Sequence, residues 1–122
     1  MTDAAVLASM TDVLSAVAGE LGLAQNACAR LDDALGDLLS AAPVEQRGAV
    51  MRELHAVDLL NQQIAALAGF MTRLSGGVGE AITVEVKDAL GAITLGDVAR
   101  RLGEGLGVGA TIDAVSDDVD FF

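Results

Sequence analysis

Ten apolar residues in the first third of the chain alternate spacings of three and four without a break. This heptad pattern brings one side chain after another onto the same face of a helix. It predicts one long helix over residues 2–41, roughly 60 Å in length if straight, with Thr2 as a suitable N-cap. The positions are Leu7, Met10, Leu14, Val17, Leu21, Ala24, Cys28, Leu31, Leu35 and Leu38.

A second helix is predicted to run back along the first. Pro43 ends the first helix, and residues 41–44 are few enough to reverse the chain as an antiparallel hairpin. The returning helix covers residues 44–74, and Ser75-Gly76-Gly77 ends it, since glycine suits the left-handed cap. Cys28 falls on the seam between the helices, which indicates a small buried side chain rather than a reactive thiol.

The second helix is apolar on more than one side. Its main stripe faces the hairpin, whereas Leu59 and Phe70 point elsewhere and need a third helix or a second subunit to cover them. The stripe consists of Val50, Leu54, Val57, Asn61, Ile64, Ala68, Met71 and Leu74.

Residues 78–102 are predicted as a third helix, itself apolar on two sides. The TVEV segment within it has strand character, but no partner strand is evident, so a helix is favoured. We therefore expect an all-α fold: a long antiparallel helical hairpin plus a third helix, forming a four-helix-type bundle, as a homodimer. The bundle domain is placed at residues 1–102.

Composition restricts the class of partner. Hydrophobic residues make up 52% of the 122 residues and aromatic ones 2%, which favours closely packed helices over a β-sandwich. The formal net charge of -11 disfavours nucleic acid and anionic membrane surfaces and favours a basic protein partner. A single cysteine, no signal-like start and no uncharged stretch long enough to span a bilayer lead us to expect a cytoplasmic protein.

Asp58 and Gln62 form a pair of polar side chains on the second helix. Residues four apart share a helix face, so the carboxylate and the amide stand one above the other. They lie just beyond one flank of the buried stripe, beside the small residues Ala65, Ala66 and Gly69. A surface of this kind lets another protein approach closely.

The segment DLLNQQI, residues 58–64, resembles the D-x-x-x-Q segment of the CheZ-like chemotaxis phosphatase family, which includes CheZ and CheT. The resemblance covers about twenty residues of one helix. It implies a protein phosphatase that hydrolyses the aspartyl phosphate of a CheY-like response regulator. It also implies that Gln62 orients the attacking water and that Asp58 pairs with the receiver's conserved lysine. Mg²⁺ would belong to the receiver, and the chain needs no cofactor of its own.

The C-terminal residues suggest a second contact with a partner. Residues 103–116 contain several glycines and are predicted as a flexible linker. The tail that follows combines carboxylates with two aromatic rings, a composition typical of docking segments. CheZ also ends in an acidic-hydrophobic segment that docks on CheY; alternatively, the rings fold back and cap the bundle. The tail consists of Asp117, Asp118, Val119, Asp120, Phe121 and Phe122.

Three competing interpretations remain open. Asn61 lies three residues after Asp58 and also fits an acid-plus-amide pair, although its angle points it into the apolar seam. His55, the one histidine, allows a phosphotransfer protein, but no lysine or arginine lies one turn away on its face. A non-catalytic adaptor that binds a receiver through the tail is the third. One histidine and one cysteine supply no metal ligand set, and no phosphate-binding glycine loop is present.

Overall fold

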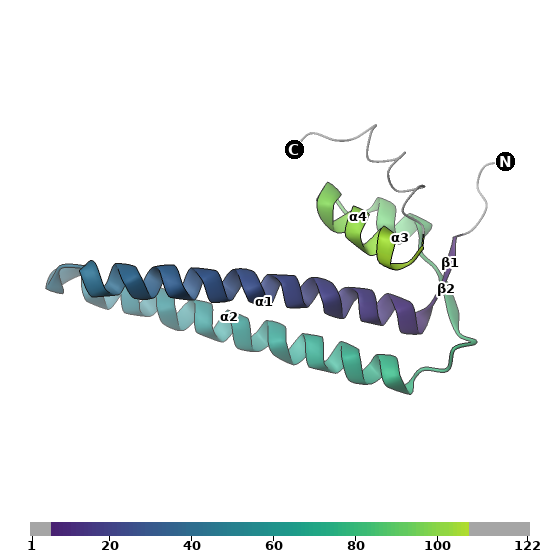
Figure 1. Cartoon of the computed structure of the whole chain (residues 1–122), viewed down its shortest axis with the longest axis horizontal. Helices are drawn as coiled ribbons and strands as arrows, with labels where there is room; N and C mark the ends of the chain where they lie inside the picture. The colour runs from purple at the N-terminus through teal and green to yellow at the C-terminus, as the bar shows by residue number, and fades with distance from the viewer. Residues whose placement is uncertain (1–5, 108–122) are drawn as a thin grey trace. The chain divides into compact units, whose positions relative to one another are not determined.

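The computed structural model describes residues 6–107, which form four helices and one two-stranded antiparallel sheet (Figure 1). Two long helices, α1 and α2, pack together and are joined by a tight turn, so the expected all-α hairpin is confirmed. In chain order the elements are β1 (Leu7–Ser9), α1 (Met10–Ala41), α2 (Val44–Gly77), β2 (Thr83–Glu85), α3 (Lys87–Gly91) and α4 (Gly96–Gly105).

The first helix begins later than its heptad pattern predicts. Leu7 pairs with Glu85, Ala8 with Val84 and Ser9 with Thr83, so these three residues form β1 instead of a first helical turn. Ser9 then caps α1, because its hydroxyl oxygen accepts the Asp12 N–H at 3.0 Å. The predicted cap, Thr2, lies outside the described residues.

The predicted third helix over residues 78–102 is wrong. Its place is taken by β2 and two short helices, α3 and α4. The β-branched pair Thr83 and Val84 suits an extended strand, and residues 7–9 supply the partner that sequence reasoning did not find. α4 also continues through Gly105, so residues 103–105, predicted as linker, are helical.

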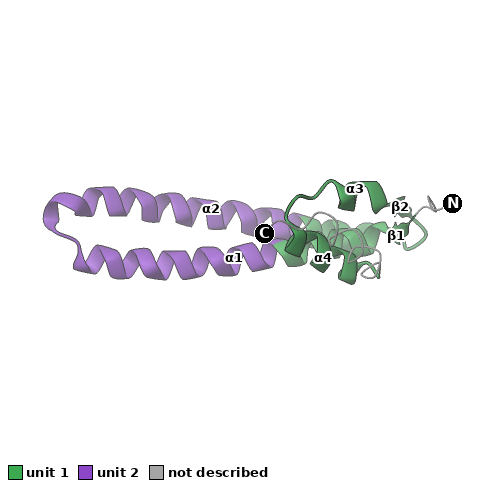
Figure 2. Cartoon of the chain, turned by 90° about the horizontal axis from the view of Figure 1, so that it is seen from above, with its two compact units in different colours: residues 1–20, 71–122 green, residues 21–70 purple. Residues whose placement is uncertain are grey.

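The chain divides into two compact units (Figure 2). Unit 1 comprises residues 1–20 and 71–122, and within its described part a small apolar core joins the sheet to the short helices. Ala8, Val86, Leu90 and Ala99 form this core. Six partly buried side chains pack against it: Val6, Val13, Val84, Ile93, Leu102 and Leu106.

Polar contacts also hold unit 1 together. The buried Ser75 hydroxyl donates to the Thr11 carbonyl oxygen at 3.1 Å and lies 3.0 Å from the Ser15 hydroxyl, so the two long helices are joined here. Glu20 on α1 accepts two hydrogen bonds from the Arg101 guanidinium on α4, at 2.7 and 2.9 Å. This bidentate pair lowers the pKa of Glu20 below its ordinary value, chiefly through the hydrogen bond from Arg101.

Unit 2, residues 21–70, is the hairpin formed by the later part of α1 and the earlier part of α2 (Figure 2, purple). The Arg47 Nε donates to the Ala42 carbonyl oxygen at 3.2 Å and closes the turn at Pro43. Of residues 21–70, all of which the structure describes, only Cys28 and Ala42 are buried. The expectation of a buried Cys28 is confirmed, and Leu59 and Phe70 are exposed as predicted.

Candidate functional site

Asp58 and Gln62 lie on the exposed surface of α2 in unit 2. The Gln62 Nε2 donates a hydrogen bond to the Asp58 Oδ2 at 3.1 Å. Helical spacing alone brings the two side chains together, because residues four apart stack on one face. With the nitrogen held by Asp58, the Gln62 carbonyl oxygen is oriented as an acceptor, and the carboxylate keeps its second oxygen for a cation.

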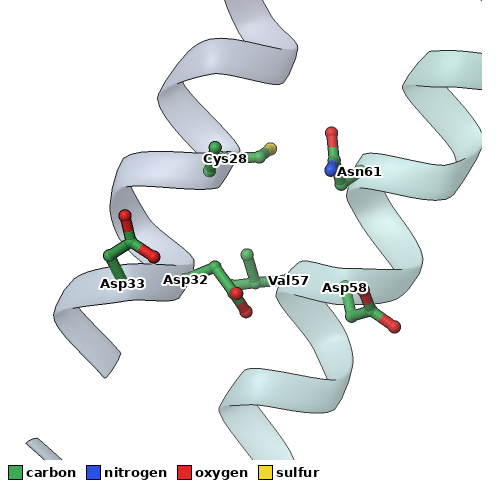
Figure 3. Close-up of a pocket in the computed structure, with 7 residues that line it drawn as sticks. Cys28, Asp32, Asp33, Val57, Asp58 and Asn61 are labelled. Carbon is green, nitrogen blue, oxygen red and sulfur yellow. The ribbon is translucent and has the colours of Figure 1, made fainter. Parts of the chain in front are cut away.

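A small hollow of about 140 Å³ lies beside this pair, between the two helices of unit 2. In Figure 3 the Asp58 carboxylate projects away from α1, whereas Cys28 and Asn61 extend into the space between the helices. The residues that line the hollow are Cys28, Ala29, Asp32, Asp33, Val57, Asp58 and Asn61.

Two carboxylates in this lining, Asp32 and Asp33, come from α1 and were not singled out in the sequence. They are exposed, so together with Asp58 they give this side of unit 2 a negative potential. Their position was within reach of sequence reasoning. If the chain is folded back at Pro43, residues equally far from the turn face each other, which sets Asp32 and Asp33 opposite residues 54 and 53, about one helical turn before Asp58.

Asn61 occupies a different environment from Gln62. It is only partly exposed, and its Oδ1 is buried without a hydrogen-bond partner. In this conformation the Asn61 oxygen is out of reach of an approaching protein, whereas the Gln62 amide is exposed on the surface. The geometry therefore favours Gln62 over Asn61 as the amide of an acid-plus-amide pair.

The other candidate residues are distributed along the chain. His55 is exposed on α2, one turn before Asp58. The predicted docking tail, Asp117 to Phe122, lies outside the described residues. Within residues 6–107, no three side chains of histidine, cysteine, aspartate or glutamate are arranged to hold a metal ion. None of the helices described is both long and apolar enough to span a bilayer.

Over residues 7–122 the chain matches the family model described as "Domain of unknown function (DUF8776)". The chain belongs to the DUF8776 family. The match begins at the first residue of β1, so the DUF8776 domain includes the strand pair, both long helices and the C-terminal residues. No curated protein and no solved structure matches the chain. The description of the DUF8776 family names no activity.

Proposed function

We propose that this DUF8776 protein is a protein phosphatase that accelerates hydrolysis of the aspartyl phosphate of a CheY-like response regulator. The single observation that carries the proposal is the exposed Gln62 amide, hydrogen-bonded to Asp58 at 3.1 Å on a long helix. A rigid helix suits insertion into a partner's active site, because it holds its side chains in fixed positions.

The chemistry required of the chain is modest. An aspartyl phosphate is already reactive, and the receiver supplies the Mg²⁺ that neutralises the phosphoryl oxygens. A helper protein therefore needs only to hold a water molecule in line with phosphorus. The Gln62 carbonyl oxygen accepts a hydrogen bond from that water. A neutral amide does this without bringing another negative charge to the phosphoryl group, as a carboxylate would.

Asp58 has two roles in this proposal. It fixes the Gln62 amide through the Nε2 hydrogen bond, and its second oxygen pairs with the receiver's conserved lysine. Asp32 and Asp33 extend the acidic surface around Asp58, which favours association with a basic rim on the receiver. The tail residues 117–122 add a second contact with the same receiver.

Phosphate release from a purified phosphorylated receiver, measured at several receiver concentrations, tests the proposal. The kcat reports how well Gln62 positions the water, and the KM reports the contact of Asp58 with the receiver. Gln62→Ala lowers kcat by on the order of a hundredfold, the usual effect of removing one hydrogen-bonding group that stabilises the transition state of an enzyme. Asp58→Ala raises KM as well, because the contact with the receiver lysine is lost. Gln46→Ala, which removes an exposed glutamine from the first turn of the same helix, is the matched control and keeps the native rate. Rates for Gln62→Ala and Asp58→Ala equal to the native rate would exclude the phosphatase function.

Two other functions compete with this one. A phosphotransfer protein would use the exposed His55, and His55→Gln would then abolish phosphoryl transfer to the chain, whereas a phosphatase keeps its activity. A non-catalytic adaptor would bind the receiver through the tail alone. A chain ending at residue 116 distinguishes the adaptor, because a phosphatase retains slow activity at high receiver concentration and an adaptor retains none. A cytoplasmic location and a homodimer belong to the same proposal.

A further inference from the structure

Unit 2 carries a second heptad pattern that its own hairpin leaves exposed. On α1 and on α2, apolar or neutral residues again alternate spacings of three and four, next to the stripe that faces the other helix. We call these positions the second seam. It consists of Ala24, Ala27, Leu31, Ala34 and Leu38 on α1, and of Ala56, Leu60, Gln63, Leu67 and Phe70 on α2. Ala24, Leu31 and Leu38 also fit the first heptad pattern, but Leu31 and Leu38 are exposed and Ala24 is only partly buried, so on α1 the two patterns share these positions at their common edge.

The large side chains of the second seam are half exposed. Leu31 and Leu38 on α1 expose 49% and 55% of their surface, and Leu60 and Leu67 on α2 expose 47% and 51%. Single exposed leucines are ordinary on protein surfaces, but an uncharged and mostly apolar face of this length is typical of an interaction site.

Both halves of the second seam lie on the same side of the hairpin. At about 100° per residue, each half is displaced from the buried stripe of its helix by roughly a quarter to a third of a turn, in the same rotational sense. Because the two helices are antiparallel, equal senses of rotation lead to the same side. Asp58 and Gln62 are displaced in the opposite sense, so the candidate site lies on the other side of unit 2.

We propose that the second seam binds the second seam of another copy of this chain, so that two copies of unit 2 form a four-helix bundle. The face is self-complementary, as a two-fold interface requires, because α1 presents mostly alanines and α2 mostly large side chains. When α1 of one copy packs on α2 of the other, small residues meet large ones and interdigitate.

The charge distribution favours a second copy of this chain, rather than a basic protein, as the molecule that binds the second seam. None of the ten positions of the second seam carries a charge, although the whole chain has a formal charge of -11. A basic partner would be drawn instead to the opposite side, where Asp32, Asp33 and Asp58 lie. The uncharged seam is the surface on which two acidic chains can approach each other closely.

The size of the face agrees with a stable dimer. Residues 21–41 of α1 extend for roughly 30 Å, and two packed helices are about 20 Å wide, so the face projects to roughly 600 Å². The accessible area of a ridged surface exceeds its projection. A standard interface buries about 800 Å² from each partner, which unit 2 is long enough to provide. The dimer then presents two Asp58–Gln62 pairs on its outer sides.

Sedimentation equilibrium of the full chain, native and with one charge introduced, tests this proposal. The native chain is expected at twice the 12.4 kDa of a single chain. Leu67→Glu places an unpaired charge in the interface, and association weakens by on the order of a hundredfold or more. Met51→Glu is the matched control, since Met51 is 45% exposed on the opposite side of α2 and the dimer persists.

A second measurement keeps the proposal testable if Leu67→Glu fails to fold. The thermal midpoint of the native chain, followed by circular dichroism, is expected to rise with protein concentration, because association stabilises only the folded chain. A native chain that is monomeric, with a concentration-independent midpoint, overturns the proposal and assigns the face to another protein. A dimer that survives Leu67→Glu, or one that Met51→Glu dissociates, overturns the assignment to this face.

Discussion

The two units of this chain differ in how many stabilising contacts each makes within itself. Unit 1 buries Ala8, Val86, Leu90 and Ala99 in a common core and adds a capped helix, a strand pair and a bidentate ion pair. Unit 2 buries only Cys28 and Ala42 among its fifty residues, all described. Yet unit 2 carries the Asp58–Gln62 pair.

This difference indicates that the two units have different roles, one in stability and the other in binding. A unit with its own core folds on its own contacts, whereas an isolated two-helix hairpin with few buried side chains depends on a partner for stability. Local stability within one chain is not uniform, and binding surfaces are drawn from its less stable parts. We therefore propose that unit 2 is the part of the molecule that contacts other proteins.

The largest expected contrast between the units comes from shortening one leucine in each. Leu90, 5% exposed in the core of unit 1, loses its packing in Leu90→Ala, and the free energy of unfolding falls by about 3 kcal/mol. Leu59, 55% exposed on α2, lies outside the second seam, and Leu59→Ala costs less than about 1 kcal/mol. Urea denaturation followed by circular dichroism measures both. Equal losses would remove the distinction between the units.

A smaller contrast is expected from two serines. Ser9 caps α1 in unit 1 by accepting the Asp12 N–H, and Ser9→Ala costs about 1 kcal/mol because that N–H loses its partner. Ser40 in unit 2 donates to the Gly36 carbonyl oxygen within its own helix, so Ser40→Ala is expected to be nearly neutral. Chemical denaturation of the two variants side by side gives the difference. A larger loss in Ser40→Ala would contradict the account of unit 1 as the better-defined unit.

The smallest expected effect concerns the Glu20–Arg101 pair of unit 1. Arg101 lowers the folded-state pKa of Glu20, so the pair stabilises the fold above pH 4.5, the ordinary pKa, and this stabilisation is lost as the pH falls through the lowered pKa. Because both side chains are partly exposed, solvent screens the pair and its contribution to stability is small. Glu20→Gln should reduce stability at pH 7 and match the native chain at low pH. An unchanged difference across this pH range would contradict the assignment.

The long helices could be predicted because the residues that determine them are close together in the sequence. The heptad spacing from Met10 to Leu38 and the turn at Pro43 predict the hairpin with no reference to distant residues, although Leu31 and Leu38 are exposed in it. The strand pair was not predictable in this way, because it joins residues 7–9 to residues 83–85 across most of the chain. Leu7 also fits the heptad spacing, so the partner of the TVEV strand was concealed within a helical pattern.

At the site, sequence reasoning found the residues of α2 but not those of α1. Asp58 and Gln62 are four apart, so helical geometry alone brings them into hydrogen-bond contact. Asp32 and Asp33 approach the same region only through the hairpin, which requires the pairing of two helices to be known. The buried Oδ1 of Asn61 agrees with its predicted angle into the seam.

The most direct test of the central claim is the single-turnover decay of a phosphorylated CheY-like receiver mixed with excess protein. We predict that the native chain and Gln46→Ala shorten the lifetime of the aspartyl phosphate equally, and that Gln62→Ala loses on the order of a hundredfold of this acceleration while still binding the receiver. A Gln62→Ala chain that accelerates decay as fast as the native one would contradict the claim that the exposed amide on α2 positions the attacking water.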